Sequence, residues 1–189
     1  MIAAVDLRAE TLQAADLVKR DRKAGLARLD EIFAQGAVPA PALDGRYQGA
    51  LLTTSINPLL DATARAFFGL WLPWHGKVFN AAAQTGDNMF DNSGLWLSRL
   101  VFAGYKDYLP DGAGRSRALT FRTYTGAGKD DPGVQVLKLD YNLDVNPSFV
   151  VRDVLDELVQ VGAGYYLGKA HIHRPRGWRC AAYFTLQVS

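Results

Sequence analysis

The feature that most constrains the fold is a two-residue alternation of side chains near the C-terminal end of the chain. In GYYLGKAHIH, residues 164–173, one set of alternate positions holds Tyr166, Gly168, Ala170 and Ile172, and the other holds Lys169, His171 and His173. In WRCAAYFTLQV, one set holds Cys180, Ala182, Phe184, Leu186 and Val188. A period of two is typical of a β-strand with one buried face. We therefore expect two strands whose small and apolar faces point inward, while Lys169, His171 and His173 face water or the N-terminal helix.

Shorter segments with strand character fill most of the chain before this pair. GRYQGALLTT, WHGKVFNA, MFDNSGLWLSRLVF, RALTFRTYTG and VQVLKLDYNL are rich in strand-forming residues, and PDGAG and GAGKDDPG between them are typical of turns. Short connections favour antiparallel pairing, so we predict about seven strands between Arg46 and Val188. Closure of such a sheet into a barrel removes its edges and can enclose a ligand.

Helical patterns are expected in three places. Residues 9–35 carry apolar side chains mostly three or four positions apart, and Gly36 is a natural C-terminal stop. Gly25 interrupts this pattern and suggests a division into two helices. NPLLDATARAFFG predicts a short helix that Gly69 ends. Residues 147–161 predict a late helix whose acidic residues, Asp156 among them, lie opposite the apolar stripe and face water. The predicted fold class is therefore mainly β, an antiparallel barrel with an N-terminal helical extension and a late helix (α+β). We predict the extension over residues 1–36 and the barrel over 44–189, within a single domain.

Composition narrows the classes of partner. The net charge is +2 with scattered Lys and Arg, which does not predict nucleic-acid binding. No apolar run is long enough to span a bilayer, and no signal peptide is recognised, so we expect a cytoplasmic protein. Cys180 is the single cysteine, which excludes an intrachain disulfide. The apolar stripe of the N-terminal helices needs a cover, which the barrel or the second chain of a homodimer would supply.

Two short motifs resemble those of lipocalin-like (calycin) barrels. LDGRYQGALL resembles their Gly-x-aromatic-x-Gly opening, with Tyr47 in place of the signature tryptophan of the Gly-x-Trp-x-Gly type of bacterial protein of unknown function. WHGKVF resembles their Trp-x-Gly-Lys-x-Phe strand, and the late helix with GYYLGKAHI is similar to their closing part. The resemblance covers residues 44–188. It implies that Tyr47 plugs one end of the barrel and that the cavity holds a small apolar or aromatic molecule, or haem as in nitrobindin-like relatives.

The candidate ligand-binding residues follow from the faces of the strands. Tyr141 shares the more uniformly apolar face of its strand with Leu137 and Leu139, so it is expected to point inward. Gly168 and Ala170 would leave space beside Tyr166, as a cavity wall needs. Lys77 and His75 share a face with Phe79 and would enter the same cavity if that face is inward. The candidate set is Tyr141, Tyr166, Gly168, Ala170, Lys77 and His75.

The charged and imidazole side chains leave alternatives open. A lysine on a strand is more often exposed, and an inward Lys77 would need a carboxylate partner or an anionic ligand. His171 and His173 could chelate a metal together, but a solvated pair beside a turn is the simpler interpretation, and we predict no metal site. No cofactor is expected, although His75 or His171 could ligate haem iron.

These observations predict a protein that binds a small, largely hydrophobic or aromatic molecule inside a barrel. One alternative is an enzyme, an isomerase, cyclase or hydrolase, that acts on a hydrophobic molecule with Lys77, Tyr141 or Tyr166 as acid–base groups. A second alternative is a haem-binding protein. The identity of the ligand does not follow from the residues.

Overall fold

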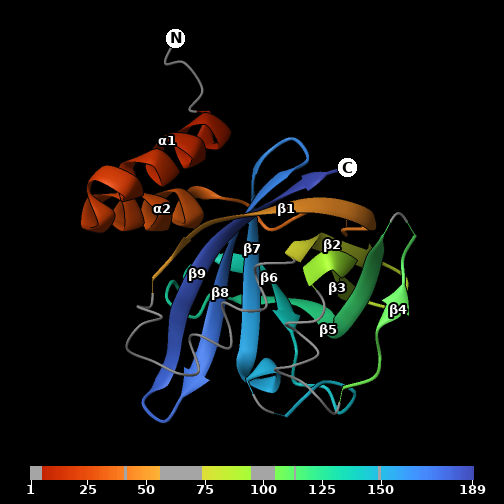
Figure 1. The fold of residues 1–189 in the computed structure, drawn as a ribbon. Helices are drawn as coiled ribbons and strands as arrows, with labels where there is room; N and C mark the ends of the chain where they lie inside the picture. The colour runs from red at the N-terminus through yellow and green to blue at the C-terminus, as the bar shows by residue number, and fades with distance from the viewer. Residues whose placement is uncertain (1–5, 41, 56–73, 95–104, 113, 149) are drawn as a thin grey trace.

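Eight antiparallel strands form a closed barrel, and two helices lie against its outer surface (Figure 1). The computed structural model describes residues 6–40, 42–55, 74–94, 105–112, 114–148 and 150–189. The helices are α1 (Leu7–Arg20) and α2 (Arg22–Gln35). The strands are β1 (Gly45–Thr54), β2 (Trp74–Asn80), β3 (Thr85–Asp91), β4 (Leu109–Pro110), β5 (Arg115–Ala127), β6 (Gln135–Asp140), β7 (Val154–Gly162), β8 (Tyr165–Arg174) and β9 (Gly177–Val188). Short 3-10 turns occur at η1 (Asn92–Gly94) and η2 (Val151–Asp153).

The strands are joined in a simple up-and-down order. The hydrogen-bonded sequence is β3-β2-β1-β9-β8-β7-β6-β5, and the pairing of β3 with β5 closes the ring. The two-residue strand β4 adds to β5 outside this ring. The predicted class, mainly β with antiparallel pairing and an N-terminal helical extension, is confirmed, with eight barrel strands where about seven were expected. None of the described helices is long and apolar enough to cross a membrane.

The late helix predicted over residues 147–161 is wrong. This region contains the turn η2 and the strand β7 instead. β7 is covered on both sides, so its apolar residues do not alternate with polar ones. Their spacing therefore also fits a helix. Val154 and Leu158 belong to the interior core, whereas Val159 and Val161 belong to the core under the helices. A strand buried on both faces carries a nearly continuous apolar run, which periodicity cannot distinguish from a helix.

Two separate apolar cores hold the fold together. The interior core draws residues from every strand of the barrel, among them Phe79, Phe121 and Phe184. The outer core lies between α2 and the outer face of β7–β9, where Leu29, Ile32 and Phe33 are fully buried. The apolar stripe of the N-terminal helices is thus covered by the barrel of the same chain, and the helices lie beside β8 and β9 in Figure 1.

The helical hairpin is capped at both of its starts. The Asp6 side chain accepts hydrogen bonds from the backbone N–H groups of Arg8 and Ala9 at the start of α1. Asp21 ends α1 and caps α2, because its side chain accepts from the N–H of Ala24. The division of the helix therefore falls at Asp21, and not at Gly25 as the sequence suggested. Gly25 is a close-contact position instead, since a Cβ atom there would lie 2.4 Å from the backbone nitrogen of Val18.

Strands β8 and β9 follow the predicted alternation, with two exceptions. Tyr166, Ala170 and Ile172 belong to the interior core, as expected. On β9 the pairing with β8 is irregular, because Ala170 pairs with Ala182 whereas His171 pairs with Cys180. Ala181 is the extra residue of this bulge and lies in the interior core, which turns Cys180 to the outer core. The inward prediction for Cys180 is therefore wrong, and Val188, also predicted inward, is 53% exposed at the end of the strand.

The outer face of β8 carries the predicted polar residues, of which Lys169 and His171 are buried and His173 is exposed. Lys169 is 1% exposed and its Nζ atom lies 2.6 Å from Asp30 of α2 and 3.0 Å from Asp131 of the β5–β6 turn. Glu157 of β7 binds Lys138 at 2.7 Å and accepts from the backbone N–H of Lys129 in the same turn. These contacts fasten both α2 and the β5–β6 turn to the barrel wall.

Candidate interior site

The interior core contains a group of four buried polar residues, which we call the interior polar cluster. Its members are Lys77 of β2, Asn88 of β3, Tyr141 directly after β6, and Asp156 of β7. Each of the four residues is at most 6% exposed. The register brings the first pair together, because Lys77 lies directly opposite Asn88 on the neighbouring strand. The cluster therefore joins β2 and β3 to β6 and β7 through the inside of the barrel.

Lys77 is the centre of this cluster. Its Nζ atom lies 2.9 Å from Oδ2 of Asp156, 2.8 Å from Oδ1 of Asn88 and 2.5 Å from the hydroxyl of Tyr141. Lys77 thus points inward, and Asp156 is the carboxylate partner that an inward lysine requires. An anionic ligand is not needed to balance its charge.

The other members of the cluster also bond to one another. Tyr141 donates to Oδ2 of Asp156 at 3.1 Å, and Asn88 donates through Nδ2 to the Tyr141 hydroxyl and to the carbonyl of Leu119. The indole N–H of Trp74 donates to Oδ1 of Asn88 at 3.0 Å. Oδ1 of Asp156 is buried and has no hydrogen-bond partner among the described residues.

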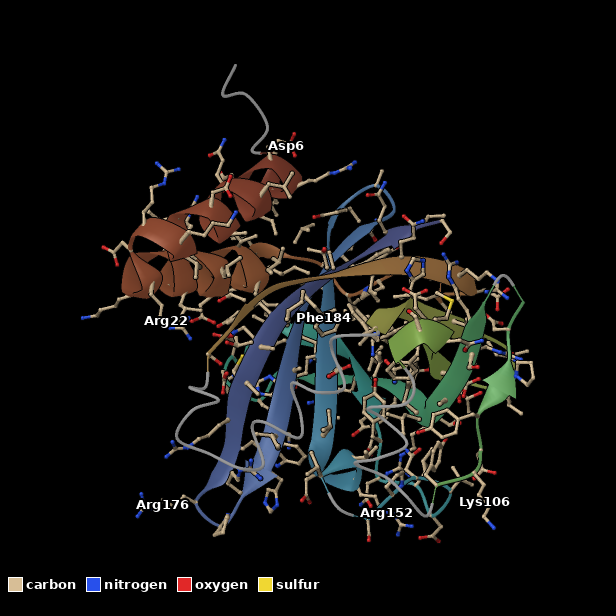
Figure 2. The ribbon with its side chains drawn as sticks, in the orientation of Figure 1. Asp6, Arg22, Lys106, Arg152, Arg176 and Phe184 are labelled. Atoms are coloured by element: carbon tan, nitrogen blue, oxygen red, sulfur yellow. The ribbon has the colours of Figure 1, made fainter. Side chains whose placement is uncertain are left out.

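Aromatic rings surround the lysine. The Nζ atom of Lys77 lies between 5.1 and 5.6 Å from the ring centres of Trp74, Phe121, Tyr141 and Phe184. Rings at this distance attract a cation through their negative faces. Phe184, labelled in Figure 2, comes from β9, so residues of four parts of the sheet converge on one charged group.

Burial shifts the acid–base behaviour of two cluster members. Desolvation lowers the pKa of Lys77, although the charge of Asp156 opposes this shift. Desolvation raises the pKa of Tyr141 well above its ordinary value, and the charge of Asp156 adds to the effect. The phenol therefore stays protonated and can donate its hydrogen bond at every physiological pH.

The structure brings two of the predicted site residues, Lys77 and Tyr141, into direct contact. Ala170 lies beside Asp156, the partner of Lys77, because the two residues pair across the sheet. Tyr166 belongs to a different part of the interior, where its ring packs edge-on against Tyr47 at 5.7 Å, and Tyr47 packs in the same way against Phe79. Gly168 is covered by Phe184, since a Cβ atom there would lie 2.3 Å from the ring.

The histidines lie outside the interior polar cluster. A bulge in β2, where Trp74 pairs with Phe90 and Gly76 with Met89, makes His75 the extra residue of the strand. Trp74 takes the inward position next to Lys77, and His75 lies 3.9 Å from the carboxylate of Asp91. His171 is fully buried on the outer face of β8, with Nε2 3.2 Å from Glu157 but without the alignment of a hydrogen bond. The ring of His173 packs against Trp178.

Sequence reasoning missed Asn88, Trp74 and Asp156 as site residues. Asp156 was predicted to lie on the water-facing side of the late helix, and this prediction is wrong because the segment is a strand. The signal available was the high β-branched content of VVRDVLDELVQV, which favours a strand. Alternation along a strand would then place Asp156 on the face of Val154 and Leu158, as the structure does.

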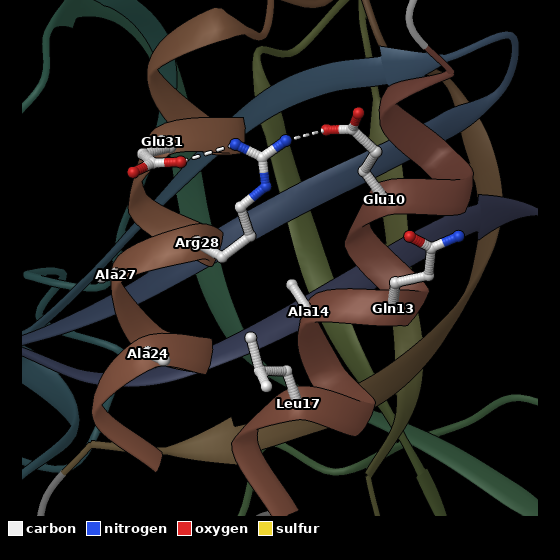
Figure 3. Close-up of a pocket in the computed structure, with 8 residues that line it drawn as sticks. All are labelled: Glu10, Gln13, Ala14, Leu17, Ala24, Ala27, Arg28 and Glu31. Carbon is white, nitrogen blue, oxygen red and sulfur yellow. Dashed lines mark hydrogen bonds and ion pairs between the residues drawn. The ribbon is translucent and has the colours of Figure 1, made fainter. Parts of the chain in front are cut away.

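Two hollows on the outside of the molecule are formed by charges that already have partners. A groove of about 380 Å³ lies between α1 and α2, where Arg28 of α2 binds Glu10 of α1 across the groove and Glu31 on its own helix (Figure 3). A hollow of about 220 Å³ near Trp178 contains Arg152, which binds Asp144, and Lys129, which lies over the indole ring. The interior polar cluster is the candidate site because it is a buried group of charged and polar residues inside the barrel, with an acceptor atom, Oδ1 of Asp156, that has no partner among the described residues.

The fold and this site define the chain as a closed antiparallel β-barrel with a polar centre. A crystal structure of a protein from Thermomonospora curvata has a similar fold, with a TM-score of 0.51 and 16% sequence identity. The similarity covers 94% of this chain and 99% of that chain, and at this identity it shows the fold alone. No known protein family matches the chain, and no curated protein matches it significantly.

Proposed function

We propose that the barrel binds a small, largely apolar or aromatic molecule in its interior, next to the interior polar cluster. The observation that carries this proposal is the buried Lys77–Asp156 ion pair, in which Oδ1 of Asp156 has no partner in the described part of the chain. Replacement of a buried ion pair by apolar side chains is often neutral or stabilising, so stability alone does not account for such a pair. Recognition of a ligand does account for it. The motifs that resemble lipocalin-like barrels support the same function.

Space for the ligand is expected beside Asp156 rather than beside Gly168. Across β7, β8 and β9, the register aligns Asp156 with Ala170 and then with Ala182. Two alanines in a row next to the carboxylate leave more room than the neighbouring row, where the ring of Phe184 covers Gly168. The ligand is therefore proposed to contact Ala170 in the row that Asp156, Ala170 and Ala182 form.

The test is to identify a molecule that co-purifies with the full chain. Native mass spectrometry followed by extraction into organic solvent is expected to show a small apolar compound, and the emptied protein should bind a neutral fluorescent probe such as N-phenyl-1-naphthylamine saturably. Ala170→Trp should abolish probe uptake while the melting temperature stays close to that of the wild type. Ala163→Trp, at an exposed turn, is the control for an added indole.

A packed interior would give a different result. In that case Ala170→Trp would overpack the core and cost about 1–3 kcal/mol of stability. A large fall in melting temperature, together with no extractable molecule and no saturable probe uptake by the wild type, would contradict the proposed function.

A second candidate function is acid–base catalysis on a hydrophobic molecule, as an isomerase, cyclase or hydrolase. The observation in its favour is that Lys77, Tyr141 and Asp156 exchange hydrogen bonds directly and that burial lowers the pKa of Lys77. Incubation of the extracted molecule with the protein in heavy water tests it. Deuterium incorporation that Tyr141→Phe abolishes would support catalysis, whereas unchanged recovery of the molecule would favour binding alone.

Haem binding, the homodimer and the cytoplasmic location stay proposals that derive from the sequence. For haem, a histidine ligand would have to come from outside the interior polar cluster, because neither His75 nor His171 is a member of it. A Soret band in the purified protein and its sedimentation velocity test the first two.

A further inference from the structure

The hydrogen-bonding capacity of Lys77 is fully used. An ammonium group has three protons, and the Nζ atom of Lys77 has three acceptors within 2.9 Å, on Asn88, Tyr141 and Asp156. No proton of Lys77 is therefore free for a ligand unless one of these bonds breaks. A ligand that bound through an anionic group would find no available donor on this lysine.

The two neutral members of the cluster, Asn88 and Tyr141, also have partners for their polar atoms. Oδ1 of Asn88 accepts from Trp74 and Lys77, and its Nδ2 donates to Tyr141 and to the carbonyl of Leu119. The Tyr141 hydroxyl accepts from Lys77 and donates to Asp156. Each polar atom of these two side chains already has at least one partner within the described part of the chain.

The open position in this cluster is an acceptor. The Asp156 side chain is 3% exposed, and its Oδ1 atom has no partner among the described residues although Oδ2 has two. A buried carboxylate oxygen without a donor costs free energy, because it has lost its water and gained nothing in return. A ligand that brings a donor to this atom would recover that energy.

The charge balance selects against ionic ligands. Lys77 and Asp156 neutralise each other, and no other charged residue belongs to the interior polar cluster. An anion would add a second negative charge beside Asp156, and a cation would lie near the ammonium of Lys77, in both cases at low dielectric constant where repulsion is strong. The surrounding aromatic rings and the neighbouring Ala170 and Ala182 provide apolar contact.

We propose that the ligand of the barrel is a small, neutral, aromatic or apolar molecule that donates one O–H or N–H hydrogen bond to Oδ1 of Asp156. This inference rests on the proposed function, because it specifies the ligand of the same site. The rings of Trp74, Phe121, Tyr141 and Phe184, together with Ala170, contact the body of the ligand. Asp156 selects for ligands that carry a donor group. Molecules that offer only acceptors are selected against.

Three compounds of similar size test the donor requirement on the wild-type protein. Indole carries one N–H donor, benzofuran replaces that donor with an oxygen acceptor, and benzoate is an anion. Titration calorimetry or ligand-detected NMR on the emptied full chain is expected to show indole binding at least about tenfold more tightly than benzofuran, with benzoate weakest, because a hydrogen bond to a charged group is stronger than one between neutral groups.

A double variant assigns the discrimination to Asp156. Lys77→Met with Asp156→Leu replaces the ion pair by apolar side chains, an exchange that folded proteins often tolerate. In this variant the affinity for indole should fall to that for benzofuran, while the affinity for benzofuran is retained. Circular dichroism and thermal melting verify that the variant is folded, and Asp140→Asn, at an ion pair with Arg122 on the outer surface, is the matched control.

The outcomes separate this inference from the proposed function. Equal binding of indole and benzofuran, a preference for benzoate, or discrimination that survives in the double variant overturns the donor assignment and leaves the binding function standing. If none of the three compounds binds, the donor assignment is also overturned, and the co-purified molecule then decides the proposed function separately. An extracted ligand without any O–H or N–H group would overturn the donor assignment as well.

Discussion

Glycines in the barrel wall make room for interior aromatic rings. A Cβ atom at Gly168 would lie 2.3 Å from the ring of Phe184, and one at Gly86 would lie 2.4 Å from the ring of Phe121. Gly168→Ala must therefore displace Phe184, and we expect it to lower the free energy of unfolding by about 1–3 kcal/mol. Urea titration measures this change. Gly133→Ala is the matched control, because a Cβ atom there has nothing within 4 Å. Equal stability of the two variants would contradict the close packing of Phe184.

The Lys77–Asp156 pair should behave as one unit. Lys77→Met leaves the Asp156 carboxylate buried without its cation, and breaking a buried pair in this way typically costs about 3–5 kcal/mol. The double variant Lys77→Met with Asp156→Leu removes both charges, so its stability should be much closer to that of the wild type. Urea titration of the three proteins gives the coupling energy. A double variant that is less stable than the single one would refute this interpretation of the pair.

Among the elements, the helical hairpin α1–α2 is the part whose loss is expected to matter most for solubility. It covers the apolar outer face of β7–β9, where Val159, Leu167 and Tyr183 are buried. Deletion of residues 1–35 exposes this face and also removes Asp30, a partner of Lys169. We expect a lower melting temperature and aggregation, measured by differential scanning fluorimetry and light scattering. Unchanged melting and solubility would show that the helices are an independent arm.

A single substitution in α2 tests the same contact without truncation. Phe33 is fully buried against the barrel, whereas Leu12 of α1 is 49% exposed. Phe33→Ala should cost about 3–5 kcal/mol, because it removes a buried aromatic side chain and leaves a cavity. Leu12→Ala should change the stability little. If both substitutions have the same small effect in urea titration, the packing of α2 on β7–β9 contributes less than its burial indicates.

For the molecule as a whole, Glu157 links stability to pH. Burial alone would raise its pKa, but His171, Lys138 and the backbone N–H of Lys129 outweigh burial and lower the pKa from 4.5 to about 2. A carboxyl whose pKa is lower in the folded state stabilises the fold above its unfolded pKa, and this stabilisation is lost as the pH falls through the folded pKa. The contribution of Glu157 is thus complete above pH 4.5 and decreases toward pH 2.

The comparison with Glu157→Gln isolates this contribution from those of the other carboxylates. At pH 6 the variant should be clearly less stable than the wild type, because it lacks the charge that Lys138 pairs with. The difference in the free energy of unfolding should shrink between pH 4.5 and pH 2.5, because there the carboxyl of the unfolded wild-type chain binds its proton while the folded one stays largely ionised. Urea titrations at both ends of this range measure it, and a constant difference would contradict the lowered pKa.

The sequence alone determined the class of fold and much of the orientation of the strands. The alternation along residues 164–173 placed Ala170 and Ile172 inside and Lys169 outside, and α1 and α2 were expected within residues 9–35. Tyr141 was identified as inward from the uniform apolar face of its strand. These predictions succeed because each rests on local periodicity, which reflects one buried face. The short helix predicted in NPLLDATARAFFG lies outside the described residues.

Tertiary structure decided the rest, because the remaining features depend on what covers both faces of a strand and on irregular pairing. The sequence of β7 predicts a helix because α2 and the β5–β6 turn cover its outer face, so that both of its faces carry apolar residues. The same error placed Asp156 in water. Bulges at His75 and Ala181 reverse the direction of Trp74 and Cys180, and a bulge is set by the partner strand. The inward position of Lys77 could not be predicted, because a buried charge requires a partner that distance along the sequence does not reveal. That partner is Asp156, which lies 2.9 Å away in the folded chain.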